Sequence, residues 1–203
     1  MHGLRMKCAL LIFAAAVAAF AADNEKTTFQ AKPAGEYPHR QTSEKVTIAA
    51  APFVTDEQTK DAFGKINPWR FGLLPVLVVI QNDGKDAIRV DRMKFVYQLP
   101  DNSKIDATPA ADIKYLDGAQ KPKAVPGPLG GIHVGRSKNP LGEWEIEGRS
   151  FSAKVIPPGQ SASGFVYFRT PVSSEAASLY ISGLVNAASG NELYYFEIPI
   201  SSK

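Results

Sequence analysis

The fold is decided by the stretch from Gly72 to Asn82, which reads Gly-Leu-Leu-Pro-Val-Leu-Val-Val-Ile-Gln-Asn. Its apolar residues are continuous, whereas a strand with one face in water alternates apolar and polar residues. A short apolar run rich in β-branched residues is typical of a strand that is covered on both faces. We therefore predict a central strand here. Because Pro75 has no N–H to donate, pairing on the side that it faces is expected to begin after it.

The segments on either side of this stretch have the character of further strands. The tetrapeptide Asn82-Asp83-Gly84-Lys85 predicts a tight hairpin, because Asn-Asp and Asp-Gly tolerate the positive φ angles of such turns. The alternating segment 87–91 is then the returning strand. More strands are expected at 45–53, 93–99, 104–107, 161–169, 178–184 and 193–200. This succession of short strands and turns predicts an all-β fold, a sandwich of two antiparallel sheets.

Helices are expected to be few and short. Thr55 or Asp56 supplies an N-cap oxygen, and Gly64 ends the predicted helix after Phe63. A single helical turn is expected within 109–116. The segment 143–155 is a further helix candidate, which Gly148 weakens.

The chain divides into a leader, a flexible segment and one domain. Residues 1–21 have the features of a secretory signal peptide, with a basic start, an apolar run and the small-x-small pattern Ala19-Phe20-Ala21. The apolar run is shorter than the roughly 20 residues that span a bilayer. We expect 22–44 to be flexible, because it is polar and contains scattered prolines. Residues 45–200 then form the sandwich, interrupted by a Gly/Pro-rich insertion at 117–142, a loop length that is usually functional or disordered.

Composition excludes several classes of function. The single cysteine, Cys8, precedes the apolar run, so lipid attachment to it is not expected, and the mature chain would have no disulfide or thiol nucleophile. Cleavage also removes Arg5 and Lys7, which changes 23 basic and 20 acidic residues to 21 and 20, a net charge of +1. A near-neutral chain without basic blocks is not expected to bind nucleic acid or an anionic membrane.

Two segments carry a resemblance to a known class of protein. Residues 76–105 contain two strands, the turn between them and a late Asn-containing turn. Residues 155–171 contain a Pro-Gly turn, small residues, Gly164, an aromatic strand and a closing proline. Together they resemble the small immunoglobulin-like domains of secreted bacterial proteins, a family largely of unknown function, some of whose members are similar to a secreted mycobacterial antigen. The resemblance covers about 45–200, implies an exported immunoglobulin-like sandwich, and brings no catalytic residues. The chain lacks the cysteine pair and tryptophan spacing of antibody domains.

Motifs for enzymatic chemistry are weak. The histidines left after cleavage, His39 and His133, have no metal-ligand spacing, so neither a metal nor another cofactor is expected. The segment 159–164 approximates the nucleophile elbow of serine hydrolases, but it enters a strand, whereas the elbow joins a strand to a helix. The alternating glutamates of 143–147 are better explained by a solvated face than by the carboxylate pair of a glycosidase.

Candidates for contact with a ligand or partner are His133, Arg136, Trp144, Trp69 and Arg70. Tryptophan beside arginine can stack against sugars, peptides or aromatic groups. The other interpretation of Trp69, a plug that closes one end of the sandwich, stays open. His133 and Arg136 lie in the insertion, which a rigid sandwich would present as an adaptable surface.

These observations predict an exported, non-catalytic binding or structural module of the bacterial cell envelope, either periplasmic or extracellular. Its partner would be a protein or another envelope component, contacted through the insertion or by a strand added to a sheet edge. No membrane-spanning segment is expected after cleavage. Two alternatives stay open: an envelope hydrolase with an unrecognised Asp, Glu or Ser site, and an accessory subunit of a surface or export assembly. The sequence specifies neither the ligand nor the oligomeric state.

Overall fold

The computed structural model describes residues 29–64, 66–116, 144–170 and 176–200, with the short segments 124–126, 132–134 and 140–142. The predicted signal peptide at 1–21 lies outside these residues, as does most of the predicted insertion at 117–142. The helices are η1 (Ala34–Glu36), α1 (Asp56–Phe63), η2 (Pro68–Phe71), α2 (Ala110–Ile113), η3 (Pro140–Gly142) and α3 (Trp144–Gly148). The strands are β1 (Arg40–Ser43), β2 (Val46–Pro52), β3 (Leu73–Asn82), β4 (Ile88–Arg89), β5 (Lys94–Gln98), β6 (Lys104–Asp106), β7 (Ala124–Pro126), β8 (Ile132–Val134), β9 (Val155–Ile156), β10 (Ser161–Arg169), β11 (Ala177–Ser182), β12 (Val185–Asn186) and β13 (Phe196–Ile200). Within the part of the chain described, every helix is too short or too polar to cross a membrane.

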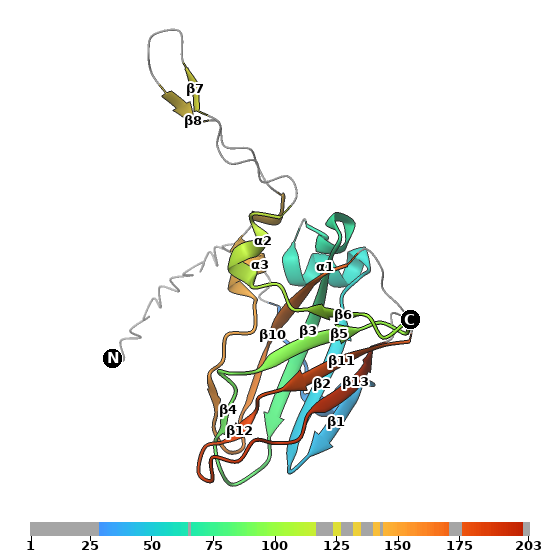
Figure 1. Cartoon of the computed structure of the whole chain (residues 1–203), viewed down its shortest axis with the longest axis vertical. Helices are drawn as coiled ribbons and strands as arrows, with labels where there is room; N and C mark the ends of the chain where they lie inside the picture. Colours follow the sequence, from blue (N-terminus) through green and yellow to red (C-terminus); the bar gives the residue numbers. More distant parts are fainter. Residues whose placement is uncertain are drawn as a thin grey trace, which may run out of the picture.

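Two four-stranded antiparallel sheets form the body of the protein (Figure 1). The strand orders are β1-β2-β3-β10 and β13-β11-β5-β6, and a smaller sheet, β12-β4-β9, lies at one end. The main core is formed by inward-facing side chains from both sheets, among them Leu74, Val78, Phe168, Leu179 and Phe196. The predicted all-β antiparallel sandwich is confirmed.

The central strand is β3, as its continuous apolar sequence predicts. It lies between β2 and β10, and its side chains alternate between two buried faces. Leu74, Val76, Val78 and Ile80 enter the main core, and Leu73, Leu77 and Val79 enter a second cluster on the other face. Pairing with β2 ends at Val76, and beyond it the Pro75 carbonyl accepts the N–H of Phe53 at 2.9 Å. The predicted effect of Pro75 is confirmed.

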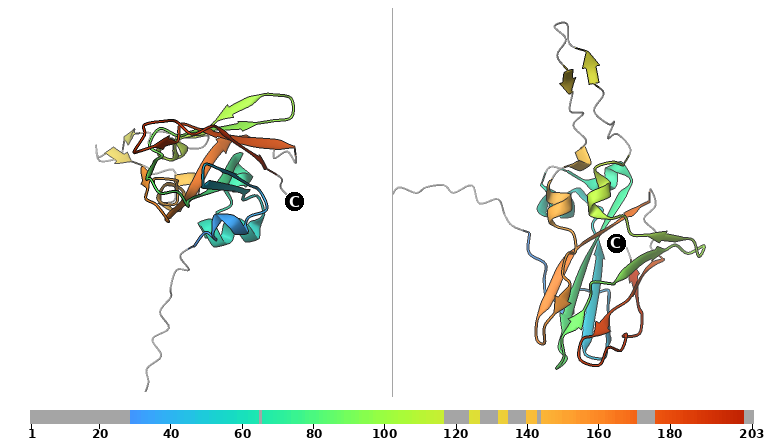
Figure 2. Two further views of the ribbon diagram at one scale, coloured as in Figure 1. Left: turned by 90° about the horizontal axis from the view of Figure 1, so that it is seen from below. Right: turned by 60° about the vertical axis from the view of Figure 1, so that its left-hand side comes forward.

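The second face of the β1-β2-β3-β10 sheet is covered by helices and by the N-terminal segment. Helix α1 contributes Phe63, α2 contributes Ile113, and α3 contributes Ile146 to an apolar cluster on this face. In the left view of Figure 2 the blue and cyan elements of this cover lie on the opposite side from the red and green strands of the other sheet. The sandwich therefore has a third layer, which explains why β3 has no polar face.

The prediction of a flexible segment at 22–44 is wrong for residues 29–44. Phe29 packs its ring against Phe53 and Phe165, with centroids 5.7 and 5.5 Å away. Ala34 is fully buried, and residues 40–43 form β1, paired with β2. Few apolar residues are needed here because they cover a face that β3 and β10 have already made apolar. The polar composition of the segment hid this role.

The predicted hairpin at 82–85 is also wrong, since β3 and β4 lie in different sheets. The Asn82 side chain accepts the N–H of Gly84 at 3.0 Å and donates to the carbonyls of Asp86 and Ile156 at 2.8 and 3.0 Å. These bonds turn the chain away from β3 and toward β9. The Asn-Asp-Gly sequence therefore forms a turn, as predicted, but the turn connects two different sheets and does not form a hairpin.

The predicted helices differ in their outcome. Thr55 is the N-cap of α1, and Gly64 ends the helix, as expected. The candidate helix at 143–155 is limited to 144–148, because the chain then runs beside β10. There Phe165 donates its N–H to the Arg149 carbonyl at 2.8 Å, and Phe151 donates to the Phe165 carbonyl at 2.9 Å.

The two sheets are joined along both sides. The backbone N–H of Glu197 in β13 donates to the Gln41 side chain of β1 at 2.7 Å. On the other side, the N–H of Thr108, just after β6, donates to the Tyr167 carbonyl of β10 at 2.7 Å. One hydrogen bond at each side therefore ties the edge strands of the two sheets together.

The Tyr167 hydroxyl fastens α3 to the sheet, which yields a first prediction. This buried hydroxyl donates to the Ile146 carbonyl at 2.7 Å, and burial raises the pKa of Tyr167 well above its ordinary value. Tyr167→Phe leaves that carbonyl unpaired and should lower the free energy of unfolding by about 1–2 kcal/mol. Hydrogen exchange should speed up most at the amides of α3. Tyr115→Phe, at a side chain that is 70% exposed, is the matched control and should change neither quantity.

Candidate functional site

The structure brings together two of the five predicted contact residues. Trp69 and Arg70 lie in η2, at the same end of the sandwich as α1. Trp144 begins α3 and is 57% exposed. His133 lies in β8, opposite Val125 of β7, and Arg136 lies outside the described residues. Trp69 and Arg70 are therefore the first residues of the candidate site.

Helix η2 forms because its sequence fixes both ends. The Asn67 side chain accepts the N–H of Trp69 at 3.0 Å, and Pro68 follows at the first helical position, where a missing N–H costs nothing. Gly72 ends the helix with a φ of 71°, a left-handed conformation that glycine adopts readily. Trp69 is half-buried against the main core, which supports its interpretation as a plug. Arg70 and Phe71 consequently face outward.

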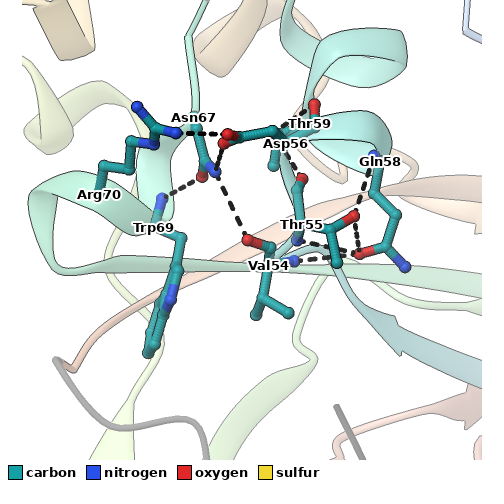
Figure 3. Close-up of polar contacts among 8 residues, drawn as sticks. All are labelled: Val54, Thr55, Asp56, Gln58, Thr59, Asn67, Trp69 and Arg70. Atoms are coloured by element: carbon teal, nitrogen blue, oxygen red, sulfur yellow. Dashed lines mark hydrogen bonds and ion pairs between the residues drawn. The ribbon is translucent and has the colours of Figure 1, made fainter. Parts of the chain in front are cut away.

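A network of polar side chains joins η2 to the start of α1 (Figure 3). Asn67 donates to the Asp56 carboxylate at 2.7 Å and to the Val54 carbonyl at 3.4 Å. Arg70 forms an ion pair with the same carboxylate. The hydrogen bond from Asn67, together with Arg70, lowers the pKa of Asp56 below its ordinary value of 3.8. The network therefore persists at neutral pH and is lost only as the pH falls through that lowered pKa.

Helix α1 is itself held by a capping box, so Asp56 has a fixed position. The Thr55 hydroxyl accepts the N–H of Gln58 at 3.2 Å, and the Gln58 side chain accepts the N–H groups of Thr55 and Val54, both at 3.2 Å (Figure 3). Such reciprocal bonds satisfy donors that a helix start leaves free. The carboxylate that orients Arg70 thus stands on a rigid support.

Beside this network lies a hollow of about 520 Å³. Its lining includes Asp56, Lys60, Asn67, Arg70 and Phe71. Phe71 is 51% exposed, and the side chain of Arg70 is 68% exposed. An aromatic ring next to a guanidinium with donors to spare suits a partner that presents a carboxylate together with an apolar group. We call Asp56, Asn67, Arg70 and Phe71 the α1–η2 site.

The residues considered for catalysis do not assemble with this site. Ser161 and Ser163 are exposed positions in β10, and Glu145 and Glu147 lie on α3, whereas Glu143 lies outside the described residues. In the described part of the chain, no three His, Cys, Asp or Glu side chains are grouped as a metal site would require.

Sequence reasoning missed Asp56 and Asn67 as parts of the site. From the sequence, Asp56 is expected only as a possible N-cap, and Asn67 only as part of the possible plug Asn67-Pro68-Trp69. They lie 11 positions apart, with no local pattern that connects them. The sequence signal that could have found Asn67 is an asparagine directly before a proline, which is typical of the cap of a short helix. Its contact with Asp56, at the start of α1, appears only in the fold.

Comparisons with known proteins identify no family. Neither a protein-family model nor a curated protein matches the chain. Among solved structures, it is similar to YcdA of Bacillus subtilis, a provisionally described lipoprotein, with 13% identity, a TM-score of 0.38, and coverage of 79% of this chain and 38% of that one. It thus spans little more than a third of YcdA's length.

Two further structures give the same picture. A Clostridium difficile β-sandwich protein that is uncharacterised has 13% identity and a TM-score of 0.32, covering 82% of this chain and 91% of that one. A functionally unknown Listeria monocytogenes protein has 10% identity and a TM-score of 0.35, covering 81% and 82%. At these identities and TM-scores the similarities assign no function. Of the resemblance to secreted immunoglobulin-like domains, the structure supports the β-sandwich fold.

Proposed function

We propose that the protein is exported and acts without catalysis, as a rigid module that binds a protein partner in the cell envelope through the α1–η2 site. The observation that carries this proposal is the placement of Arg70. Its guanidinium is exposed, yet it is fixed by Asp56, which Asn67 and the start of α1 hold in turn. Binding sites are commonly built in this way, from exposed groups on a rigid support.

The chemistry of the site favours an acidic segment as the partner's contact. Arg70 and Lys60 both line the hollow, and the Asp56 carboxylate already accepts from one guanidinium nitrogen, Nη2. The remaining donors of Arg70 can hold a carboxylate in two parallel hydrogen bonds. Phe71 offers an adjoining apolar ring, and arginine with aromatic residues dominates binding energy in protein interfaces.

Addition of a strand to a sheet edge has less support. The open edge of the second sheet is β6, which is three residues long and carries the exposed charges Lys104 and Asp106. Short, charged edge strands oppose pairing with another chain. The α1–η2 site is therefore the better candidate for the contact.

Affinity capture from envelope extracts tests the proposal. Arg70→Ala should reduce recovery of a specific partner at least tenfold relative to the unchanged protein. Arg89→Ala is the matched control, because the side chain of Arg89 is also partly exposed, at 40%, and paired with a carboxylate, that of Asp91. Both variants should keep the melting temperature, since exposed ion pairs contribute little to stability.

Two results would contradict the proposal. One is capture of the same partners by both arginine variants, which would remove the α1–η2 site from consideration. The other is turnover of an envelope polymer by the purified protein. Fractionation of cells that produce the chain with and without residues 1–21 tests export separately.

A further inference from the structure

The outer face of the β13-β11-β5-β6 sheet carries a pair of tyrosines that sequence analysis did not single out. On β11 and β13 the alternation sends Leu179, Ile181 and Phe196 into the core. Tyr180 and Glu197 therefore lie on the outer face, directly opposite each other in the register. We call Tyr180, Tyr195 and Glu197 the tyrosine site.

The tyrosine site is ordered by contacts within the protein. The rings of Tyr180 and Tyr195 are stacked, with centroids 6.1 Å apart and planes at 28°. The Tyr180 hydroxyl bonds to the Glu197 carboxylate, and this bond raises the pKa of Tyr180 above its ordinary value. The Glu197 backbone is fixed by its bond to Gln41. Tyr195 is nonetheless 60% exposed, so a ring face is open to a partner.

Among the described residues, no ion pair joins the carboxylate of Glu197 to a lysine or arginine. The other charged residues of this face lie opposite residues other than Tyr180 and Glu197 in the strand register. Asp106 lies opposite Val96, and Lys94 and Lys104 lie opposite Ser182 and Gln98. Neither lysine lies opposite Tyr180 or Glu197. In the part of the chain that the structure describes, an exposed carboxylate beside stacked rings is thus left without an ion-pair partner.

We propose that the tyrosine site binds an arginine side chain of a protein partner. The face of an aromatic ring attracts cations, and a guanidinium can lie flat against it. The same planar group can donate two parallel hydrogen bonds to a carboxylate such as Glu197, which the ammonium of lysine cannot do. The tyrosine site lies on the β13-β11-β5-β6 sheet and offers a carboxylate, whereas the α1–η2 site is built on helices and offers a guanidinium. The two proposals can therefore fail independently.

The test is an NMR titration of the isotope-labelled protein with the peptide acetyl-Gly-Arg-Gly-amide. The matched probe replaces arginine by citrulline, which has the same shape without the charge. Shift changes should be confined to residues 178–182 and 194–198 and should be absent with citrulline. Glu197→Gln and Tyr195→Ala should each weaken binding roughly fivefold. Tyr194→Ala is the control, because this neighbour is 78% exposed and outside the stacked pair.

Three results would overturn the inference. Binding that is unchanged in Glu197→Gln, or equal for citrulline, would show that the carboxylate does not select a cation. Shifts at these residues with neutral oligosaccharides but not with arginine would make the rings a sugar platform. Self-association that Tyr195→Ala abolishes would assign this face to a second copy of the chain.

Discussion

Gly164→Ala should lower the free energy of unfolding by about 3 kcal/mol, because there is no space for a methyl group at this position. A Cβ built on Gly164 would lie 2.4 Å from the Cα of Phe151 and 2.6 Å from its nitrogen. Both atoms belong to backbone, so no side-chain rotation can relieve the overlap. For a chain of this size the loss corresponds to a fall of roughly 6–12 °C in melting temperature.

The overlap arises because a second backbone passes directly beside β10. Ser150 pairs with Phe165 as a parallel bridge, and two backbone hydrogen bonds join residues 149–151 to Phe165. Moving this segment outward would break those bonds. It would also pull Phe151 away from Phe95, with which it forms an edge-on contact at 6.1 Å. Either way of accommodating alanine therefore costs packing on one side of the sandwich.

Gly35→Ala is the matched control for this prediction. A Cβ on Gly35 would meet nothing within 4 Å, and Gly35 does not have a positive φ. The same change in backbone freedom is then made without overlap, and the stability should change by less than about 0.5 kcal/mol. Thermal and urea unfolding of both variants measure the difference. Equal stability of the two variants would show that the 149–151 segment does not lie against β10 as described.

The central strand could be predicted because its cause is local. Nine of the ten residues of β3 are buried, and a short apolar run rich in β-branched residues is typical of a strand covered on both sides. What covers it could not be predicted. The second face is covered by single residues from distant segments, such as Phe29, Phe63 and Ile146, and each is unremarkable in its own context.

Local sequence preference also failed to predict which turn forms a hairpin. A tight hairpin joins β1 to β2 through Glu44 and Lys45. Both residues have positive φ angles, 50° and 63°. Neither residue type favours that conformation. The Asn-Asp-Gly sequence, which does favour it, serves a crossover between sheets instead. Sheet pairing therefore decided the use of both turns, and local preference did not.

The candidate sites divide in a similar way. Trp69 and Arg70 are adjacent in the sequence, so their pattern was visible. Asp56 lies 14 positions from Arg70 and becomes its partner only when α1 and η2 are folded together. Tyr180 and Tyr195 are joined by the return of the chain through β12 into β13. Contacts of this kind follow from topology, which the sequence did not specify.

Asn82→Ala should lower the free energy of unfolding by about 2–3 kcal/mol, since Asn82 is fully buried and holds three chain segments together. Its side chain bonds to Gly84, Asp86 and Ile156, and its backbone bonds to Gly159 and Gln160. Alanine keeps the backbone bonds and removes those of the side chain. The carbonyls of Asp86 and Ile156 then lose the donors that the amide supplies. Asn191→Ala, at an exposed position, is the control and should have little effect.

Asn82→Asp distinguishes hydrogen bonding from simple filling of space. Aspartate has nearly the same shape as asparagine and can still accept the N–H of Gly84. It cannot donate to the carbonyls of Asp86 and Ile156, and at neutral pH it would place a buried negative charge against both. If the amide donors hold the crossover, this variant must be at least as unstable as Asn82→Ala when unfolding is measured at pH 7. Stability close to that of the unchanged protein would mean that the shape of residue 82 alone directs the chain from one sheet to the other.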